Sequence, residues 1–394
     1  MSLFKHYTNI ILIALLLIIS ALSYHPIFVS LADENAGSRF SFYVVGLTIA
    51  LFLLNIGGKW RYSKFLFYSS MLFLFAILIG LIIMGLYNSY YENELRNVAI
   101  ALVITFIGYN SNLSLKNVLS ISLIYYFFIL IVTGAQVRTN IGGFIILDSY
   151  AAFAKNSLGV LASVATIGLY IIALSSKANI KKFLLLSLSV ILFALILTIR
   201  ARASSIAVFL ICLLYTHRQY SFRSKKTLYV IFGIVVLLTI LIISGRFHYI
   251  GNFIYDSLTQ HYEADFSNER VGRGERALEM FAESPLWGIL DVNPIPVGYT
   301  YVHNFALRIL TYYGILGGFF LILIYLFQTI YIIRQCLRKE SKNIEFIGFW
   351  IMLSLLFSSL VEPTFPYGPG TAVLGAYLSL GFSLRLTERV PYSQ

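Results

Sequence analysis

The stretch "NSLGVLASVATIGLYIIALSS" (156–176) contains no charged side chain from end to end. A helix needs about 17–25 mostly apolar residues to cross the hydrocarbon core of a bilayer, and this stretch has that length and composition. Similar runs recur along almost the whole chain, which is 59% hydrophobic and only 12% charged. A soluble domain carries about 25% charged residues. The sequence therefore predicts an all-α polytopic membrane protein.

The apolar runs predict about twelve transmembrane helices, an even number that places both termini on one side of the membrane. Three regions follow along the chain: helices one to nine in 1–245, a large loop with short helices in 246–303, and helices ten to twelve with a tail in 304–394. The predicted spans are 9–31, 40–57, 65–87, 97–110, 117–134, 156–176, 183–199, 203–216, 227–245, 305–333, 344–361 and 369–385.

Basic residues concentrate in alternate loops, on the side of the N-terminus, and only three of the 17 acids share that side. The positive-inside rule makes this side cytoplasmic. The net charge of +12 is then largely topological, and we predict no nucleic-acid partner. The basic residues on this side are Lys5, Lys59, Arg61, Lys64, Lys116, Lys177, Lys181, Lys182, Arg218, Arg223, Lys225, Lys226, Arg334, Arg338, Lys339, Lys342, Arg385 and Arg389.

The loop 246–303 is much longer than the others, and long ordered loops in compact proteins are usually functional. Its segment "ERALEMFAES" has Ala277, Leu278, Phe281 and Ala282 at helical spacing, which predicts an amphipathic helix. Three arginines, at 270, 273 and 276, lie three residues apart at the start of that helix. They form either an anion-binding surface or a solvated face with glutamate partners, of which Arg276–Glu279 is one plausible pair.

Two more basic groups are expected on the same outer side. Arg200 and Arg202 join two apolar spans with scarcely any loop, where a charge is costly and indicates function unless it reaches the headgroups. His303 and Asn304 stand at the outer mouth of the tenth span, and Arg308 lies one turn deeper. Arginine binds phosphate oxygens through two parallel hydrogen bonds, and histidine can move a proton near neutral pH. These groups predict a site for a phosphate-bearing lipid, with no metal and no cofactor.

Three motifs resemble the O-antigen polymerase and ligase superfamily of bacterial envelopes. They are "TIRARASSIAVFL" (198–210), "RVGRGERALEMFAESPLWG" (270–288) and "HNFALRILTYYGILGG" (303–318). The segment "AKNSLGVL" (154–161) is similar to a further short motif of that family. Gly274 departs from the family pattern, because it stands where an aromatic residue usually follows the loop arginine.

The resemblance implies a fold similar to the GT-C type of glycosyltransferase, in a bacterial inner membrane, with the active site in the periplasm. It implies a metal-independent glycosyltransferase whose donor is an oligosaccharide linked to undecaprenyl pyrophosphate. The acceptor is either a second lipid-linked repeat unit (a polymerase) or the lipid A core (a ligase), and a chain-length regulator protein is an implied partner. The implied catalytic residues are His303 and Arg270, and the implied pyrophosphate-binding residues are Arg200, Arg202, Arg273, Lys155, Asn304 and Arg308.

Three functions remain open from the sequence. The polymerase is favoured over the ligase, because the residues of the 303–318 motif resemble those of polymerases slightly more. A lipid or solute transporter is the third, but transporters commonly contain internal repeats and place their charged residues near the membrane midplane. The sequence contains no clear repeat, and its unusual charges gather at one membrane face.

Overall fold

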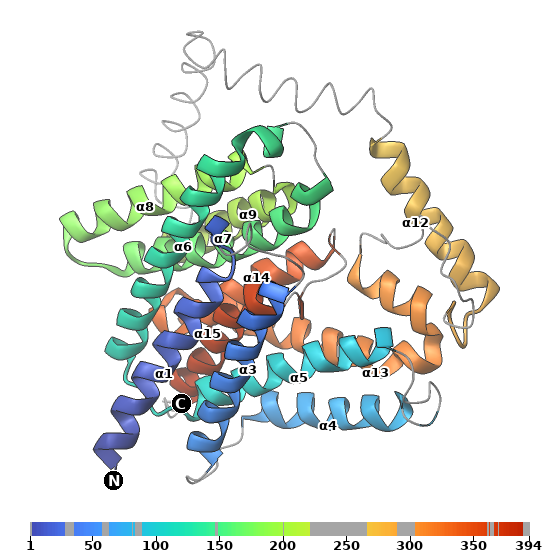
Figure 1. Ribbon diagram of the computed structural model, residues 1–394. Coiled ribbons are helices and arrows are strands. Elements are labelled where there is room, and N and C mark those ends of the chain that lie inside the picture. The colour runs from blue at the N-terminus through green and yellow to red at the C-terminus, as the bar shows by residue number, and fades with distance from the viewer. Residues whose placement is uncertain are drawn as a thin grey trace.

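The structure, a computed structural model, is helical throughout its described residues (Figure 1). It describes residues 2–27, 35–56, 63–80, 82, 89–145, 149–199, 201–220, 266–289, 304–360, 362, 366–368 and 370–388. Twelve α-helices and two short 3₁₀ helices lie in these ranges, and no strand does. The predicted span at 227–245 falls outside them.

The helices keep close to the apolar runs of the sequence. Their bounds are α1 Ser2–Leu22, α3 Asn35–Ile56, α4 Lys64–Ile79, α5 Ser89–Asn110, α6 Leu115–Ile145, α7 Ser149–Ser175, α8 Asn179–Thr198, α9 Arg202–Tyr220, α12 Phe266–Glu283, α13 Phe305–Leu337, η2 Lys339–Lys342, η3 Ile344–Phe346, α14 Ile347–Ser359 and α15 Gly370–Glu388.

Five of the described helices are long and apolar enough to cross a membrane. They are Phe4–Leu22, Leu115–Thr139, Asn156–Ser175, Asn179–Thr198 and Phe305–Leu337. Shorter apolar helices cover Tyr43–Ile56, Lys64–Ile79 and Ile344–Ser359. Many large apolar side chains on these helices are exposed, as expected for surfaces that face lipid. The chain is therefore a helical membrane protein.

Helix α15 lies at the centre of the bundle, packed against α5, α14, α7 and α1. Its side chains are buried from Ala372 to Arg385. The approach to α5 is close, because a Cβ added at Gly381 would lie 2.3 Å from the carbonyl oxygen of Thr105. Gly108 faces the same contact, where a Cβ would lie 2.6 Å from the carbonyl oxygen of Leu378. Small residues bring these two backbones together, as they commonly do in membrane helix pairs.

Hydrogen bonds group the helix ends into two faces. At the N-terminal face, where α1 begins, the amide groups of Asn9 and Asn55 bond each other. At the same face, Glu388 accepts bonds from Tyr109 at 2.7 Å and from Ser63 at 2.6 Å. The opposite face holds the end of α14 and the starts of α5 and α13.

Three differences from the predicted spans matter. Helix α1 ends at Leu22, nine residues before the predicted end at 31, because the polar turn at 23–25 precedes Pro26, which disfavours helix in the residue before it. Helix α5 begins at Ser89, two turns before the predicted start at 97. Helix α13 contains a break at Gly314, whose φ of 61° and ψ of −170° are not helical.

Candidate functional site

Asn304 starts α13 at the opposite face. Its side-chain oxygen accepts a 2.9 Å hydrogen bond from the backbone N–H of Leu307, which is the usual cap of a helix N-terminus. Its side-chain nitrogen donates to the carbonyl oxygen of Leu360, just beyond α14, at 3.2 Å. Asn304 therefore fixes the start of α13 against the end of α14, and both of its polar side-chain atoms are engaged in doing so.

Arg308, one turn into α13, forms an ion pair with Glu94 of α5. The guanidinium Nη2 lies 2.7 Å from a carboxylate oxygen, and the two side chains are 16% and 9% exposed. The guanidinium also lies over the ring of Phe305, 5.8 Å from its centre. The described residues give its Nε no hydrogen-bond acceptor. Arg308 is thus held by a buried carboxylate, and its charge is already balanced before any anionic ligand binds.

The break in α13 is filled by the turn that follows α12. The carbonyl oxygens of Pro285 and Leu286 accept hydrogen bonds from the N–H groups of Ile315 and Leu316, at 2.8 and 3.0 Å. In return, Ile289 donates to the carbonyl oxygen of Thr311 at 3.1 Å. Backbone groups that the break removes from the helix ladder are therefore bonded by the turn, as buried backbone groups must be.

Two glycines make this contact sterically allowed. Gly288 and Gly314 both have positive φ, 74° and 61°, a region that other residues rarely adopt. A Cβ on Gly314 would lie 2.3 Å from the carbonyl oxygen of Leu286, and one on Gly288 would lie 2.4 Å from that of Tyr312. The turn and the break fit each other only without side chains at these positions.

Helix α12 extends from this turn along the first part of α13 (Figure 1). The hydroxyl of Thr311 shares its proton between two carbonyl oxygens, that of Leu307 in its own helix at 2.8 Å and that of Ala277 in α12 at 3.2 Å. Ala277 is buried, whereas Leu278, expected on the same apolar face, is 55% exposed. The contact with α13 therefore covers only a narrow stripe of α12.

All three loop arginines are confirmed to lie on one helix, since residues 270, 273 and 276 fall within α12. The side chains of Arg270 and Arg273 lie outside the described residues. Arg276 is exposed, and the expected ion pair with Glu279 is wrong, because these two described side chains form no salt bridge. Both are solvated, and an exposed pair contributes little to stability.

A second contact joins the "AKNSLGVL" motif to the arginine-bearing junction. A Cβ on Gly159 of α7 would lie 2.3 Å from the Cβ of Ala201 and 3.0 Å from the hydroxyl of Ser204. Lys155 precedes Gly159 by about one helical turn, and Arg202 is the first residue of α9. Lys155, in the second turn of α7, and Arg202, at the start of α9, are therefore near each other along the two helices. Their side chains, and Arg200 as a whole, lie outside the described residues.

Both groups belong to the same face of the bundle. The ring of Tyr215, near the end of α9, packs on that of Trp350, near the start of α14, with centroids 5.5 Å apart. The two helices pack along each other, so α9 runs antiparallel to α14. Arg202 at the start of α9 and Leu360 after α14 then lie at the same end of the bundle as Asn304. His303, the proposed base, falls outside the described residues.

Sequence reasoning missed two parts of this site. Glu94 belongs to the polar segment "YYENELRN" (90–97), which reads as a loop but forms the first turns of α5. The signal that could have indicated it is Arg308, because a cation inside an apolar span requires a partner. The break at Gly314 was hidden in the apolar stretch "YYGILGG", where glycine is also common in continuous membrane helices.

No protein-family model matches the sequence, and no curated protein is similar to it by sequence search. The function therefore has to be argued from the chain's own residues.

Proposed function

We propose that the chain is a membrane glycosyltransferase that acts on a glycan carried by undecaprenyl pyrophosphate, and that it polymerises surface polysaccharide. The docking of α12 onto the break of α13 carries this proposal. It makes one structural unit of the helix that bears Arg270 and Arg273 and the helix that begins just after His303. The proposal includes about twelve spans in a bacterial inner membrane, cytoplasmic termini and a periplasmic site.

The proposed reaction needs few groups. An acceptor hydroxyl attacks the anomeric carbon of the donor, the bond from that carbon to the phosphate oxygen breaks, and its electrons leave with the pyrophosphate. His303 takes the proton of the hydroxyl, which contributes about 10²–10⁴-fold to such reactions. Arg270, Arg273 and Arg202 stabilise the charge of the leaving group, where losing one donor typically costs about 10²–10³-fold.

The ion pair between Glu94 and Arg308 has a positioning role in this scheme. It joins α5 to the first turn of α13, and it thereby holds the segment that follows His303. Because the carboxylate already balances the guanidinium, Arg308 stabilises the geometry of the site more than it binds the pyrophosphate directly.

A transporter is disfavoured by the way in which the break of α13 is filled. Broken helices in transporters present free backbone groups to their substrates. Here the N–H groups of Ile315 and Leu316 and the carbonyl group of Thr311 are bonded by residues 285–289 of the same chain. The break serves to attach α12, and it offers no open ligand site at those groups.

The test uses the host strain with its own copy of the gene deleted and complemented with variants at equal protein levels. His303→Ala and Arg270→Ala should abolish long surface polysaccharide. Arg270→Lys should clearly reduce the amount of long polysaccharide, because lysine keeps the charge but cannot form two parallel hydrogen bonds with a phosphate. Arg334→Ala is the control, since Arg334 is exposed at the far end of α13.

The products distinguish the remaining functions. Single repeat units on the lipid A core, in the deletion strain, would support the polymerase. Long chains left on the carrier lipid would select the ligase instead. Normal polysaccharide from both the His303→Ala and the Arg270→Ala proteins would refute the proposed site.

A further inference from the structure

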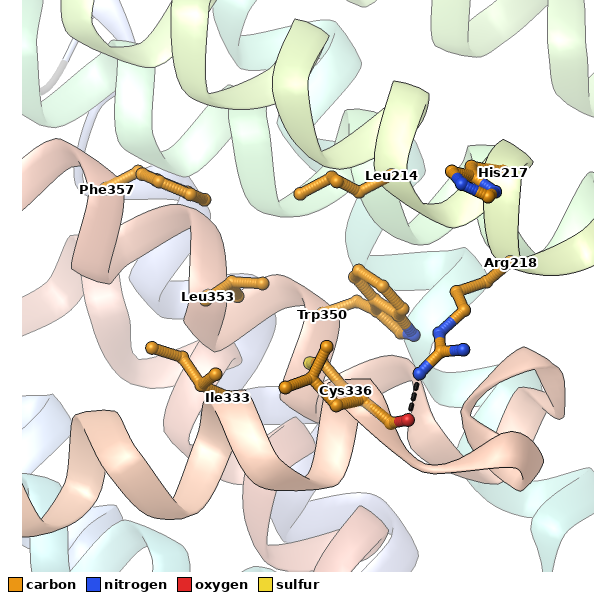
Figure 2. A pocket seen from close by; sticks show the side chains of 9 residues that line it. Leu214, His217, Arg218, Ile333, Cys336, Trp350, Leu353 and Phe357 are labelled. Carbon is orange, nitrogen blue, oxygen red and sulfur yellow. Dashed lines mark hydrogen bonds between the residues drawn. The ribbon is translucent and has the colours of Figure 1, made fainter. Parts of the chain in front are cut away.

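A groove lies between α9, α13 and α14, with one end at the N-terminal face beside Arg218 and the other at Phe357, near the end of α14 (Figure 2). Its volume is about 470 Å³, which is within the range of about 300–1,000 Å³ typical of small-molecule sites. The residues that line it are Leu214, His217, Arg218, Ile333, Cys336, Leu337, Trp350, Leu353 and Phe357.

The groove has an apolar floor and two apolar walls. Trp350, Leu353 and Phe357 follow one another along α14 and form the floor (Figure 2). The eight residues from Trp350 to Phe357 span about 10 Å along the helix axis. The walls are the last turns of α9 and of α13, which both pack on α14.

The rim of the groove is open toward the side of the bundle that would face lipid. Leu214 is 41% exposed, Ile333 40% and Leu337 64%. Side chains this apolar would be costly to expose to water, but they are the usual surface of a helix that faces hydrocarbon. An acyl chain from the surrounding bilayer could therefore enter the groove sideways without crossing any polar barrier.

One end of the groove is basic. His217 and Arg218 lie there, in the last turn of α9, opposite the end at which Phe357 lies (Figure 2). Arg218 donates a hydrogen bond to the carbonyl oxygen of Leu337 at the C-terminus of α13, which fixes the guanidinium at the mouth of the groove. No carboxylate is among the nine lining residues, and within the described residues the other N–H groups of Arg218 have no acceptor.

We propose that this groove binds one acyl chain of an anionic glycerophospholipid, with the lipid phosphate at Arg218 and His217. The apolar lining suits part of the acyl chain, and the cations at the mouth match the phosphate, for which arginine has the best geometry. The lipid belongs to the leaflet at the N-terminal face. Basic residues at that level of the membrane attract anionic headgroups by about 1 kcal/mol each. The site does not depend on the proposed glycosyltransferase activity.

Native mass spectrometry of the protein purified in detergent would test the proposal, with equimolar phosphatidylglycerol and phosphatidylcholine of identical chains. We expect about fivefold stronger retention of phosphatidylglycerol. Arg218→Gln should abolish that preference, and Arg218→Lys should restore most of it. Leu353→Trp fills the groove and should reduce the retention of both lipids. Arg334→Gln removes an exposed cation of the same face that does not line the groove, and it should change nothing.

Three results would overturn the proposal. Equal retention of the two phospholipids would remove the role of charge. If Arg334→Gln weakened the retention of phosphatidylglycerol as much as Arg218→Gln does, the preference would come from the overall positive charge of the surface and not from this groove. Displacement of phosphatidylglycerol by a lower concentration of a polyisoprenyl phosphate would assign the groove to a different lipid.

The fluorescence of Trp350 reports lipid binding in the groove without any change at Arg218. The chain has three tryptophans, so Trp60→Phe and Trp287→Phe together leave only Trp350 in the groove floor. In vesicles, phosphatidylglycerol with brominated chains should quench Trp350 more strongly than brominated phosphatidylcholine does at the same content. Equal quenching by the two lipids would contradict the proposal.

Discussion

Replacing Gly314 with alanine should detach α12 from the membrane bundle. Alanine at this φ of 61° and ψ of −170° is strained by about 1–3 kcal/mol. Its Cβ would also lie 2.3 Å from the carbonyl oxygen of Leu286 and 2.6 Å from the nitrogen of Gly288. Because both of these atoms belong to the backbone, they can move only if the turn itself withdraws. The hydrogen bonds across the break would then be lost.

Hydrogen exchange of the purified protein measures this directly. The amides of Ile289, Ile315 and Leu316 bond across the break, and they should exchange about 5- to 150-fold faster in Gly314→Ala, as expected for 1–3 kcal/mol. The control is Gly134→Ala in α6, where an added Cβ meets nothing within 4 Å. Unchanged exchange at all three amides in Gly314→Ala would refute the hydrogen-bonded contact between the turn at 285–289 and the break in α13.

Three further predictions concern the bundle and the chemistry. Glu94→Gln should lower the free energy of unfolding by about 3 kcal/mol in a thermal melt, since it leaves Arg308 buried without its partner. Adding Arg308→Gln should recover part of that loss. A further drop in stability in the double variant would contradict the pairing. Gly381→Leu should destabilise the bundle by about 3 kcal/mol through its clash with α5. The control, Gly134→Leu, should have little effect. Equal melting temperatures for the two variants would contradict the close approach of α15 to α5. Glycan transfer should persist in excess chelator, and a loss that Mg²⁺ or Mn²⁺ restores would count against a site that uses arginines alone.

The apolar pattern of the sequence predicted where the membrane helices lie, but it placed their ends poorly. The run predicted at 117–134 is the middle of α6, which extends from Leu115 to Ile145. Apolarity reports which residues would lie in hydrocarbon, whereas a helix continues into the polar interface for as long as its backbone bonds are satisfied. The same effect hid the first two turns of α5. Helix α4 packs on α5, and Glu94 in these turns pairs with Arg308 of α13.

The candidate site was predictable in its residue types and not in its pairings. The sequence indicated Arg308 as an unusual charge and Asn304 as its neighbour. It could not indicate that Glu94 pairs with Arg308, because these two residues are brought together only by the packing of α5 beside α13. Nor could it show that Thr311 and Gly314 receive α12, since a glycine or threonine within an apolar run carries no sign of the segment that docks on it.

During synthesis, α15 is the last of the described helices to leave the ribosome, yet it occupies the middle of the bundle. Until it inserts, α5 has no neighbour for the surface around Gly108, and the polar groups of Ser63 and Tyr109 lack the carboxylate of Glu388. We therefore expect the earlier helices to stay loosely packed until α15 inserts among them. A nascent chain halted before residue 370 would remain open at its centre, and it would be exposed to membrane proteases for as long as the halt lasts.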